Sequence, residues 1–264
     1  MNVLMDIVAD TRTRVARRAD AVPLSALLEA GEQRLAGPDA IRDFRGALAA
    51  PGISLIAEHK RSSPSAGVIR ADLELPDVVS AYERAGAAAL SVLTEQSRFG
   101  GALSDVALAR ASASLPILRK DFIVEEYQVH ESLAAGADAI LLIVAALDTG
   151  TLIRLHSLAT QLGLATLLEV HDGLELDATH EIGADIVGIN NRDLATLAVD
   201  VERTYELLPS VPDGALVVAE SGFREHAELE RLAAAGVDAV LIGEALMRSP
   251  DIEVATRDLL GSSG

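Results

Sequence analysis

The sequence predicts an α/β protein with a parallel sheet buried on both faces, and three features of the 264-residue chain lead to this fold class. Short runs of residues are apolar throughout instead of alternating with polar residues, as expected for parallel strands covered on both sides. The segments between these runs are amphipathic and long enough for crossover helices. Several of these segments end in glycine, which adopts the left-handed conformation that terminates a helix.

The first 50 residues differ from the rest and predict a helical N-terminal extension. Val3, Ile7 and Val15 fall on or near one helix face, with Asp and Arg residues between them. Pro23 and Pro38 divide this region into pieces, and Pro38 can open a short further helix. The sequence pattern changes at residue 53, where the short apolar runs begin.

Each apolar run is expected to be one strand. The runs are Ile53–Ala57, Ala88–Leu93, Pro116–Leu118, Ala139–Val144, Ala165–Leu168, Ile186–Ile189, Leu216–Ala219 and Ala239–Ile242. The glycines predicted to end the preceding helices are Gly86, Gly136, Gly183 and Gly236. Eight strand-then-helix units over residues 51–264 indicate a (β/α)8 barrel, the TIM barrel, in a single domain that spans residues 1–264. An open doubly wound sheet is the alternative, and it is disfavoured because no Gly-x-Gly-x-x-Gly follows the first run.

Composition excludes several classes of protein. Half of the residues are apolar, so the chain is not disordered, and without cysteine it has no disulfide scaffold, Cys-ligated zinc or thiol nucleophile. The net charge of −18 disfavours nucleic acid and anionic membrane as partners, so an anionic ligand would need positive charge concentrated in one site. The N-terminus has no basic targeting region, and the longest apolar run, Ala139–Leu147, is too short to span a bilayer. A cytoplasmic protein is expected.

Polar side chains follow the predicted strands at their C-terminal ends, where the active sites of such barrels lie. Glu58 and Lys60 are two residues apart and share one strand face, whereas His59 points the other way. Other strand ends carry Lys120, Glu169, Asn190, Arg192, Glu220, Ser221 and Glu244. Any one of these is more often a solvated loop residue. The pattern over five strands indicates instead a site where ionisable groups set one another's pKa values.

Glycines after the last two strands have two interpretations. Gly222 and Gly243 are typical of plain tight turns, but they also match the place where barrels bind phosphate through backbone N–H groups and a short helix N-terminus. His59 is more often a packing residue than a chemical one. The other histidines have no metal-ligand spacing, so no metal site is expected.

The sequence resembles the indole-3-glycerol phosphate synthase family of tryptophan biosynthesis over nearly its whole length, including the helical extension. The matching segments are Ile56–Ser65, Leu90–Glu95, Phe99–Gly101, Ile117–Ile123, Leu168–His171, Gly188–Leu194, Ala219–Gly222 and Leu241–Met247. Each motif alone is modest, but all of them in this order are highly specific. Two departures are visible: His59 stands where the family is usually apolar or aromatic, and Ala66 where a Lys is common.

The resemblance implies a carboxy-lyase with no cofactor. Its substrate would be 1-(2-carboxyphenylamino)-1-deoxyribulose 5-phosphate, which closes a pyrrole ring, releases CO₂ and then loses water to give indole-3-glycerol phosphate. By the same resemblance Lys120 is the general acid that protonates the ketone, and Lys60 lies near the substrate carboxylate and the ketone oxygen. Glu58 and Glu169 position the two lysines, and Glu169 is a candidate acid/base in the dehydration.

The remaining roles follow from the same resemblance. Asn190 and Ser221 would hydrogen-bond substrate hydroxyls or other site groups, and Glu220 belongs to the substrate-binding residues. The residues expected to fix the anionic ends are Arg192, Lys60 and Ser63, and backbone N–H groups of Gly222, Gly243 and Glu244 would hold the phosphate. Phe99 and Phe122 would flank the anthranilate ring, a role for which so aromatic-poor a chain offers few other residues.

Two other functions remain open at this point. One is a sister phosphate-binding barrel such as phosphoribosylanthranilate isomerase, which usually relies on a Cys base that this chain lacks. The other is a non-catalytic barrel that binds a phosphorylated ligand, in which His59 would be the suspected defect. In each case the expected partner is a small phosphorylated molecule, with no nucleic acid and no membrane, and a monomer is the default expectation.

Overall fold

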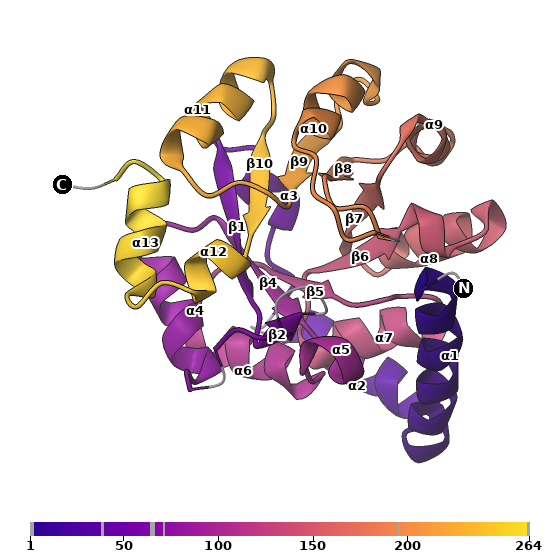
Figure 1. Cartoon of the computed structure of the whole chain (residues 1–264). Coiled ribbons are helices and arrows are strands. Elements are labelled where there is room, and N and C mark those ends of the chain that lie inside the picture. The colour runs from indigo at the N-terminus through magenta and orange to yellow at the C-terminus, as the bar shows by residue number, and fades with distance from the viewer. Residues whose placement is uncertain (1–2, 38–39, 64–66, 71, 195, 263–264) are drawn as a thin grey trace.

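A computed structural model describes residues 3–37, 40–63, 67–70, 72–194 and 196–262. Eight parallel strands of this part of the chain form a closed barrel in the order β1-β10-β9-β8-β7-β6-β5-β4 (Figure 1). Their bounds are β1 Ser54–His59, β4 Ala89–Leu93, β5 Ile117–Lys120, β6 Ala139–Ile143, β7 Ala165–Val170, β8 Ile186–Asn190, β9 Leu216–Glu220 and β10 Ala239–Ile242. The predicted barrel is therefore confirmed, with each strand within a few residues of its apolar run.

Helices surround the barrel, and short elements line its rim. The N-terminal helices are α1 Val3–Ala21, α2 Leu24–Ala36 and α3 Phe44–Leu48. The outer layer comprises α4 Leu75–Arg84, α6 Ser104–Ser112, α7 Glu126–Ala135, α8 Thr149–Gln161, α9 Gly173–Ile182, α10 Glu202–Leu207, α11 His226–Ala235 and α13 Ile252–Leu259. The short elements are α5 Gln96–Phe99, α12 Glu244–Met247, the 3₁₀ turns η1 Val144–Ala146 and η2 Leu208–Ser210, and a two-stranded ribbon of β2 Ser62–Ser63 and β3 Gly67–Val68. Among the described residues no helix is long and apolar enough to cross a bilayer.

The core has an inner and an outer part, because successive side chains of a strand point to opposite faces. In β1, Leu55 and Ala57 pack outward against α4, whereas Ile56 packs inside the barrel with Leu118 and Leu167. The next inward position after Ile56 is Glu58, so the same alternation that fills the barrel delivers a carboxylate to its C-terminal mouth.

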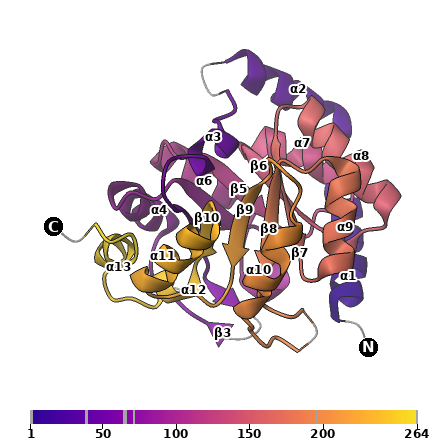
Figure 2. The same ribbon diagram turned by 90° about the horizontal axis from the view of Figure 1, so that it is seen from above.

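The N-terminal segments close the other end of the barrel and cover its side. Phe44 and Leu48 of α3 are fully buried within the inner cluster, and Ser54 at the start of β1 donates to the carbonyl of Leu48 at 3.3 Å. Helix α2 packs on α7, as Figure 2 shows. These contacts explain why α2 and α3 form helices that a short isolated peptide would barely sustain.

Asp138, just before β6, joins α2 to the barrel. Its fully buried carboxylate accepts hydrogen bonds from Arg34 at 2.7 Å, from Arg110 at 2.9 Å and from the backbone N–H groups of Arg42 and Ile117. Because Asp138 lies at the N-terminal end of its strand, this cluster serves stability rather than the site at the opposite end.

The predicted helix stops are confirmed by the backbone. The φ angles of Gly86, Gly136, Gly183 and Gly236 are +95°, +102°, +71° and +100°, in the left-handed region that glycine adopts without steric cost. Pro38 and its neighbour lie outside the described residues.

Candidate active site

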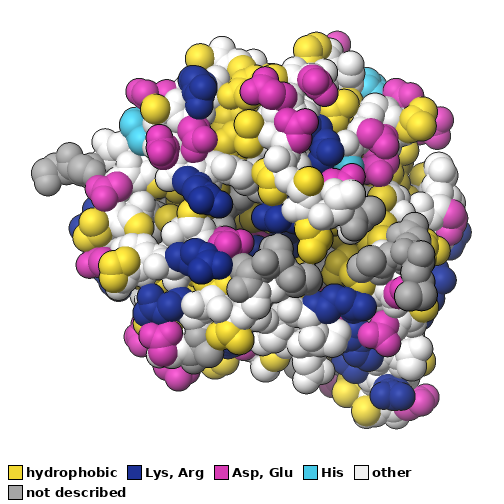
Figure 3. All heavy atoms as spheres, in the orientation of Figure 1, with side chains coloured by type: hydrophobic (Ala, Val, Ile, Leu, Met, Phe, Trp, Pro, Cys, Tyr) yellow, Lys and Arg dark blue, Asp and Glu magenta, His cyan; other side chains and the backbone are white. Residues whose placement is uncertain are grey.

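A cavity of about 750 Å³ opens at the C-terminal ends of the barrel strands. In the face shown in Figure 3, Lys and Arg side chains border a central hollow, and acidic side chains lie mostly toward the periphery. The expected site residues that line the cavity are Glu58, Lys60, Phe99, Lys120, Phe122, Glu169, Asn190, Arg192, Glu220, Ser221, Gly222, Gly243 and Glu244. Leu141 and Ile143 of β6 also line it, so residues from all eight barrel strands or from the loops after them meet at one mouth.

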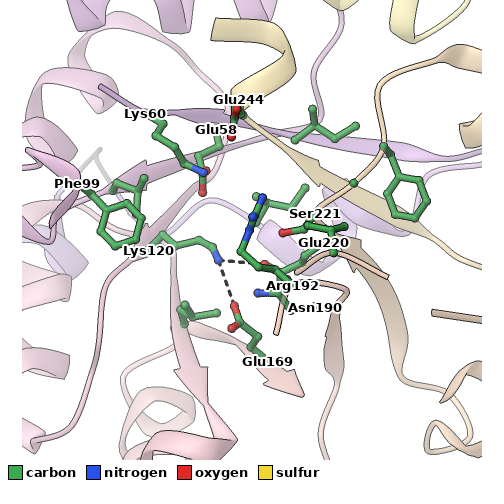
Figure 4. Close-up of a pocket in the computed structure, with 18 of the residues that line it drawn as sticks. Glu58, Lys60, Phe99, Lys120, Glu169, Asn190, Arg192, Glu220, Ser221 and Glu244 are labelled. Atoms are coloured by element: carbon green, nitrogen blue, oxygen red, sulfur yellow. Dashed lines mark hydrogen bonds and ion pairs between the residues drawn. The ribbon is translucent and has the colours of Figure 1, made fainter. Parts of the chain in front are cut away.

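Lys120, the last residue of β5, is held between two buried carboxylates. Its Nζ lies 3.1 Å from Oε2 of Glu169 at the end of β7 and 2.9 Å from Oε2 of Glu220 at the end of β9 (Figure 4). Both carboxylates are almost fully buried. Charge-assisted hydrogen bonds in a poorly solvated place fix the direction of the ammonium group, which points into the cavity.

Lys60 forms the second ion pair of the site. Its Nζ lies 2.6 Å from Oε1 of Glu58, and Ser91 in β4 donates a hydrogen bond of 3.2 Å to Oε2 of the same carboxylate. Glu58 is therefore satisfied on both oxygens, although it is almost fully buried. The expected sharing of one strand face by Glu58 and Lys60 is confirmed.

The pKa values of these groups diverge because three carboxylates share two ammonium groups. Burial acts to raise the pKa of Glu169, but Lys120, then His171 and Asn190, outweigh it and lower the pKa well below its ordinary value. Burial also acts to raise the pKa of Glu58, yet Lys60 and Lys120 lower it overall. For Glu220 burial and the negative Glu169 prevail over Lys120, so its pKa is raised.

Lys120 responds in the opposite sense. Burial disfavours its charged form, but the surrounding Glu169, Glu220 and Glu58 raise its pKa above the ordinary value, so it is an ammonium at neutral pH. The site is thus not a simple cationic pocket, since its two lysines are balanced by buried carboxylates. The further cations lining the cavity are Arg192, Arg224 and Arg248.

Two glycines let the backbone of β9 and β10 border the cavity closely. A Cβ atom at Gly243 would lie 2.8 Å from Oε1 and 2.9 Å from Cβ of Glu58, and one at Gly222 would lie 2.7 Å from Cγ1 of Val201. Gly222 also has a φ of +103°, and Ser221 before it has a φ of +67°, which is rare for a residue with a side chain. Asn191 donates a hydrogen bond of 3.0 Å to the carbonyl of Ser221 and helps to hold this turn.

Two of the sequence expectations concern residues away from the cavity. Ser63 on β2 is buried and is not among the residues that line it. His59 points away from the cavity, as predicted; it is almost fully buried and its Nε2 has no hydrogen-bond partner. Ala66 lies outside the described residues.

Sequence reasoning assigned no role to several residues that the structure brings to the site. Ser91 bonds Glu58, and the only signal for it was a hydroxyl inside an otherwise apolar run. His171 contacts Glu169 from beyond the end of β7. Arg224 and Arg248 line the cavity from the loop after β9 and from the end of α12. Within the described residues, no group of three or more His, Asp or Glu side chains is arranged to hold a metal ion.

Comparison with known proteins shows relatives that are similar to this chain in sequence over nearly its whole length. The family model described as indole-3-glycerol phosphate synthase matches residues 4–259. An indole-3-glycerol phosphate synthase of Nocardioides sp. is 48% identical over 261 residues, covering 99% of each chain. One of Rhodopirellula baltica is 44% identical over 263 residues, covering 99% of this chain and 100% of its own.

Solved structures of lower identity agree in fold alone. A 3-hexulose-6-phosphate synthase superposes with a TM-score of 0.62 at 17% identity, covering 80% of this chain and 100% of its own. A thiamine phosphate pyrophosphorylase from Pyrococcus furiosus has a TM-score of 0.60 at 20% identity, covering 83% and 96%.

Proposed function

The chain belongs to the indole-3-glycerol phosphate synthase family, and we propose that Lys120 is the general acid of its reaction. The family activity is a carboxy-lyase step of tryptophan biosynthesis that acts on a phosphorylated substrate. Ring closure converts the ketone of 1-(2-carboxyphenylamino)-1-deoxyribulose 5-phosphate into an alcohol, so a proton must reach the developing alkoxide. The buried ammonium of Lys120, aimed into the cavity by Glu169 and Glu220, supplies that proton.

The raised pKa of Lys120 suits this step. The group stays protonated throughout the neutral range, and it gives up its proton only to a strongly basic oxygen such as the alkoxide formed on ring closure. The same positive charge stabilises the alkoxide before the proton moves. This electrostatic stabilisation is stronger in a poorly solvated cavity than it would be in water.

Lys60 and Glu58 serve the substrate carboxylate in this proposal. The carboxylate must be held near the ketone until it leaves as CO₂, and Lys60 offers an ammonium whose position is fixed by Glu58 at 2.6 Å. Glu169 acts as acid/base in the dehydration, since it reaches both Lys120 and the cavity. Asn190 and Ser221 hydrogen-bond substrate hydroxyls, and Glu220 shares the binding of Lys120 with Glu169.

The phosphate is held in this proposal by backbone N–H groups of Gly222, Gly243 and Glu244. No side chain at the two glycines stands between the main chain and the cavity, which favours close approach of an anion. Arg192 adds positive charge, and Phe99 and Phe122, which line the cavity from the loops after β4 and β5, flank the anthranilate ring. Ser63 does not line the cavity, so in this proposal it would contact an anionic end of the substrate only by a shift of β2 toward the cavity.

The observation that carries the proposal is the ion-pair cluster of Lys120 with Glu169 and Glu220, at 3.1 and 2.9 Å. The test is an indole-fluorescence assay with the named substrate on the wild-type protein and on Lys120→Ala. We expect turnover in the first and a loss of kcat of about 10²–10⁴-fold in the second, the range for removing a general acid. Turnover that survives the substitution within tenfold would refute the role of Lys120.

A further inference from the structure

Glu95, the second residue after β4, caps the short helix that carries Phe99. Its Oε1 accepts hydrogen bonds from the backbone N–H of Ser97 at 3.1 Å and from the hydroxyl of the same residue at 2.6 Å. Its Oε2 accepts hydrogen bonds from the backbone N–H groups of Arg98 at 2.6 Å and of Phe99 at 3.3 Å. Because a helix of four residues is not stable by itself, α5 depends on this cap.

Arg14 in the N-terminal helix α1 binds the same carboxylate. Its Nη1 lies 2.8 Å from Oε1 of Glu95, and the side chain of Glu95 is 2% exposed, compared with 22% for Arg14. Burial acts to raise the pKa of Glu95, but the hydrogen bonds within α5 and then the one from Arg14 outweigh it and lower the pKa. The carboxylate is therefore charged at neutral pH, and Arg14 supplies the counter-charge that a buried carboxylate needs.

Glu95 borders two cavities. It lines the candidate active site, and it also lines a second cavity of about 190 Å³, whose wall includes Arg14 and other residues of α1. The residues that line this second cavity are mostly polar, so the connection of α1 to the loop after β4 depends there on polar contacts and not on apolar packing. A further contact, between Nη1 of Arg98 and Oδ2 of Asp10, is 3.9 Å long and thus too long for a hydrogen bond.

The hydrogen bonds of Glu95 connect its position to that of Phe99. Both carboxylate oxygens already accept hydrogen bonds, which leaves Glu95 poorly suited to take a proton from a substrate. The loop also closes on this residue, since the backbone N–H of Gly101 donates at 3.0 Å to the carbonyl of Glu95. Phe99 is the last residue of α5, and its ring lines the active-site cavity (Figure 4). A displacement of Glu95 would therefore move this ring.

We propose that Arg14 is a positioning residue, which acts through Glu95 to hold the ring of Phe99 against the aromatic ring of the substrate. The inference rests on the proposed role of Phe99 in flanking the anthranilate ring. Without the guanidinium of Arg14, the buried carboxylate would lose its counter-charge beside a cavity that takes an anionic substrate, so it would turn toward solvent or take up a proton. Either change weakens the cap of α5 and displaces Phe99. Arg14 thus affects substrate binding although it does not line the active-site cavity.

The test uses variants that separate the charge of Arg14 from its place in α1. Arg14→Met removes the cation and keeps a long side chain, whereas Arg14→Lys keeps the cation. Arg12→Met is the matched control, because it removes the same charge from an exposed position of the same helix. Phe99→Leu is combined with Arg14→Met in a double-mutant cycle. For each variant kcat and KM are measured by indole fluorescence, and the dissociation constants of anthranilate and of inorganic phosphate are measured by equilibrium titration.

We expect Arg14→Met to raise KM about three- to tenfold, the range for one aromatic contact, while kcat stays within about twofold of the wild type. The dissociation constant of anthranilate should rise by the same factor, and that of inorganic phosphate by less than about twofold, because only the ring end of the site is disturbed. Arg14→Lys and Arg12→Met should each raise KM less than about twofold. In the Phe99→Leu background, Arg14→Met should add less than about twofold, since the ring through which it acts is already absent.

Three outcomes would overturn the inference. One is a KM of Arg14→Met no higher than that of Arg12→Met, which would mean that Glu95 holds Phe99 without α1. Another is an equal weakening of phosphate and anthranilate binding, which would indicate a general effect of charge. The third is an equal rise of KM with and without the ring of Phe99, which would place the effect elsewhere in the site. If the wild type and Arg12→Met both failed to produce indole fluorescence, the proposed function would be contradicted, whereas the two titrations would still decide the role of Arg14.

Discussion

Nζ of Lys120 lies 2.9 Å from Oε2 of Glu220, and this contact joins strands that are separated by 100 residues in the chain. The same ammonium contacts Glu169 at 3.1 Å, yet the two carboxyls differ in charge: the pKa of Glu169 is lowered and that of Glu220 is raised. One ammonium cannot keep two adjacent buried carboxyls equally ionised. In the resting site the pair therefore divides into an ionised carboxylate, Glu169, and a group that readily becomes neutral, Glu220.

This division predicts unequal effects of two isosteric substitutions. Glu169→Gln should lower kcat at least about a hundredfold, because it removes both the anion that orients Lys120 and the proposed acid/base. Glu220→Gln should lower kcat no more than about tenfold, since the glutamine resembles a carboxyl that is already partly neutral. Steady-state fluorescence assays at pH 7.5 measure both. Equal losses in the two variants would contradict the division.

The close packing of Gly243 against Glu58 leads to a second prediction about activity. The Cβ of Gly243→Ala would meet the Oε1 and Cβ atoms of Glu58 at 2.8 and 2.9 Å, so Glu58 must shift and take Lys60 with it. We expect kcat/KM to fall at least about tenfold, because a small misplacement of reacting groups is costly. The free energy of unfolding should fall by about 1–3 kcal/mol, the usual cost of overpacking a buried site. Gly173→Ala, where a Cβ would meet nothing within 4 Å, is the control.

His59 predicts a pH-dependent loss of stability. Burial, then the charge of Arg61, lower its pKa to about 4, whereas an unfolded histidine titrates near 6.5. Between these two values the unfolded chain binds a proton at His59 that the folded protein does not. His59 therefore does not lower the free energy of unfolding through protonation above pH 6.5, but it lowers it increasingly as pH falls toward 4. His59→Leu should gain about 3 kcal/mol at pH 5 and about 1 kcal/mol at pH 7, where it removes only an unpaired Nε2.

Urea unfolding at the two pH values measures this effect. The difference between pH 5 and pH 7 decides the case, because a simple packing gain would be the same at both. Activity should remain at the wild-type level, since His59 points away from the cavity. That result would also remove the suspicion that this residue makes the barrel non-catalytic.

His171 predicts the opposite pH dependence. Its pKa is raised to about 10 by Glu169 and Glu175, against the burial that lowers it, so the folded state holds a proton that the unfolded chain releases near pH 6.5. The stabilisation is present below pH 6.5 and is lost as pH rises through 10. His171→Gln should abolish this alkaline decline. Thermal unfolding from pH 6 to pH 10 tests it, and an unchanged decline in the variant would contradict the shift.

Asp138 predicts the largest change in stability. Asp138→Ala would leave the buried guanidinium groups of Arg34 and Arg110 without their carboxylate, at a cost of about 3–5 kcal/mol. Because this cluster lies at the end of the barrel opposite the cavity, kcat of the folded variant should be unchanged. Circular dichroism in urea measures the loss. A separate early transition of the N-terminal helices would contradict the prediction that residues 1–264 form one domain.

The parts of the fold that sequence predicted well are those fixed by local chemistry. Short continuous apolar runs bounded by turn signals are typical of strands covered on both faces, and Gly136 and Gly236 stand where the backbone needs a left-handed residue. The alternation along β1 and the residue after it also predicted that Glu58 and Lys60, but not His59, would line the cavity. These features depend on neighbours within a few residues, so one sequence suffices.

The parts that sequence could not provide depend on distances across the barrel. Lys120 pairs with carboxylates that lie 49 and 100 residues away in the chain, and no spacing of residues in the sequence predicts these pairs. In the sequence, Ser91 does not differ from any other buried serine. Only the fold, which brings its hydroxyl to 3.2 Å from Glu58, identifies it as part of the site. The pairing of the two lysines with Glu58 and Glu169 was expected from the family resemblance, but the contact of Lys120 with Glu220 was not. The catalytic roles themselves stay predictions.

Because β1 pairs with β10, the barrel closes only when the last strand is in place. A nascent chain that has left the ribosome as far as β9 carries two open sheet edges, on β1 and β9, with no partner for their backbone groups. Such edges invite pairing with other chains. Truncation that removes β10, Ala239–Ile242, should therefore harm solubility during synthesis before it harms chemistry.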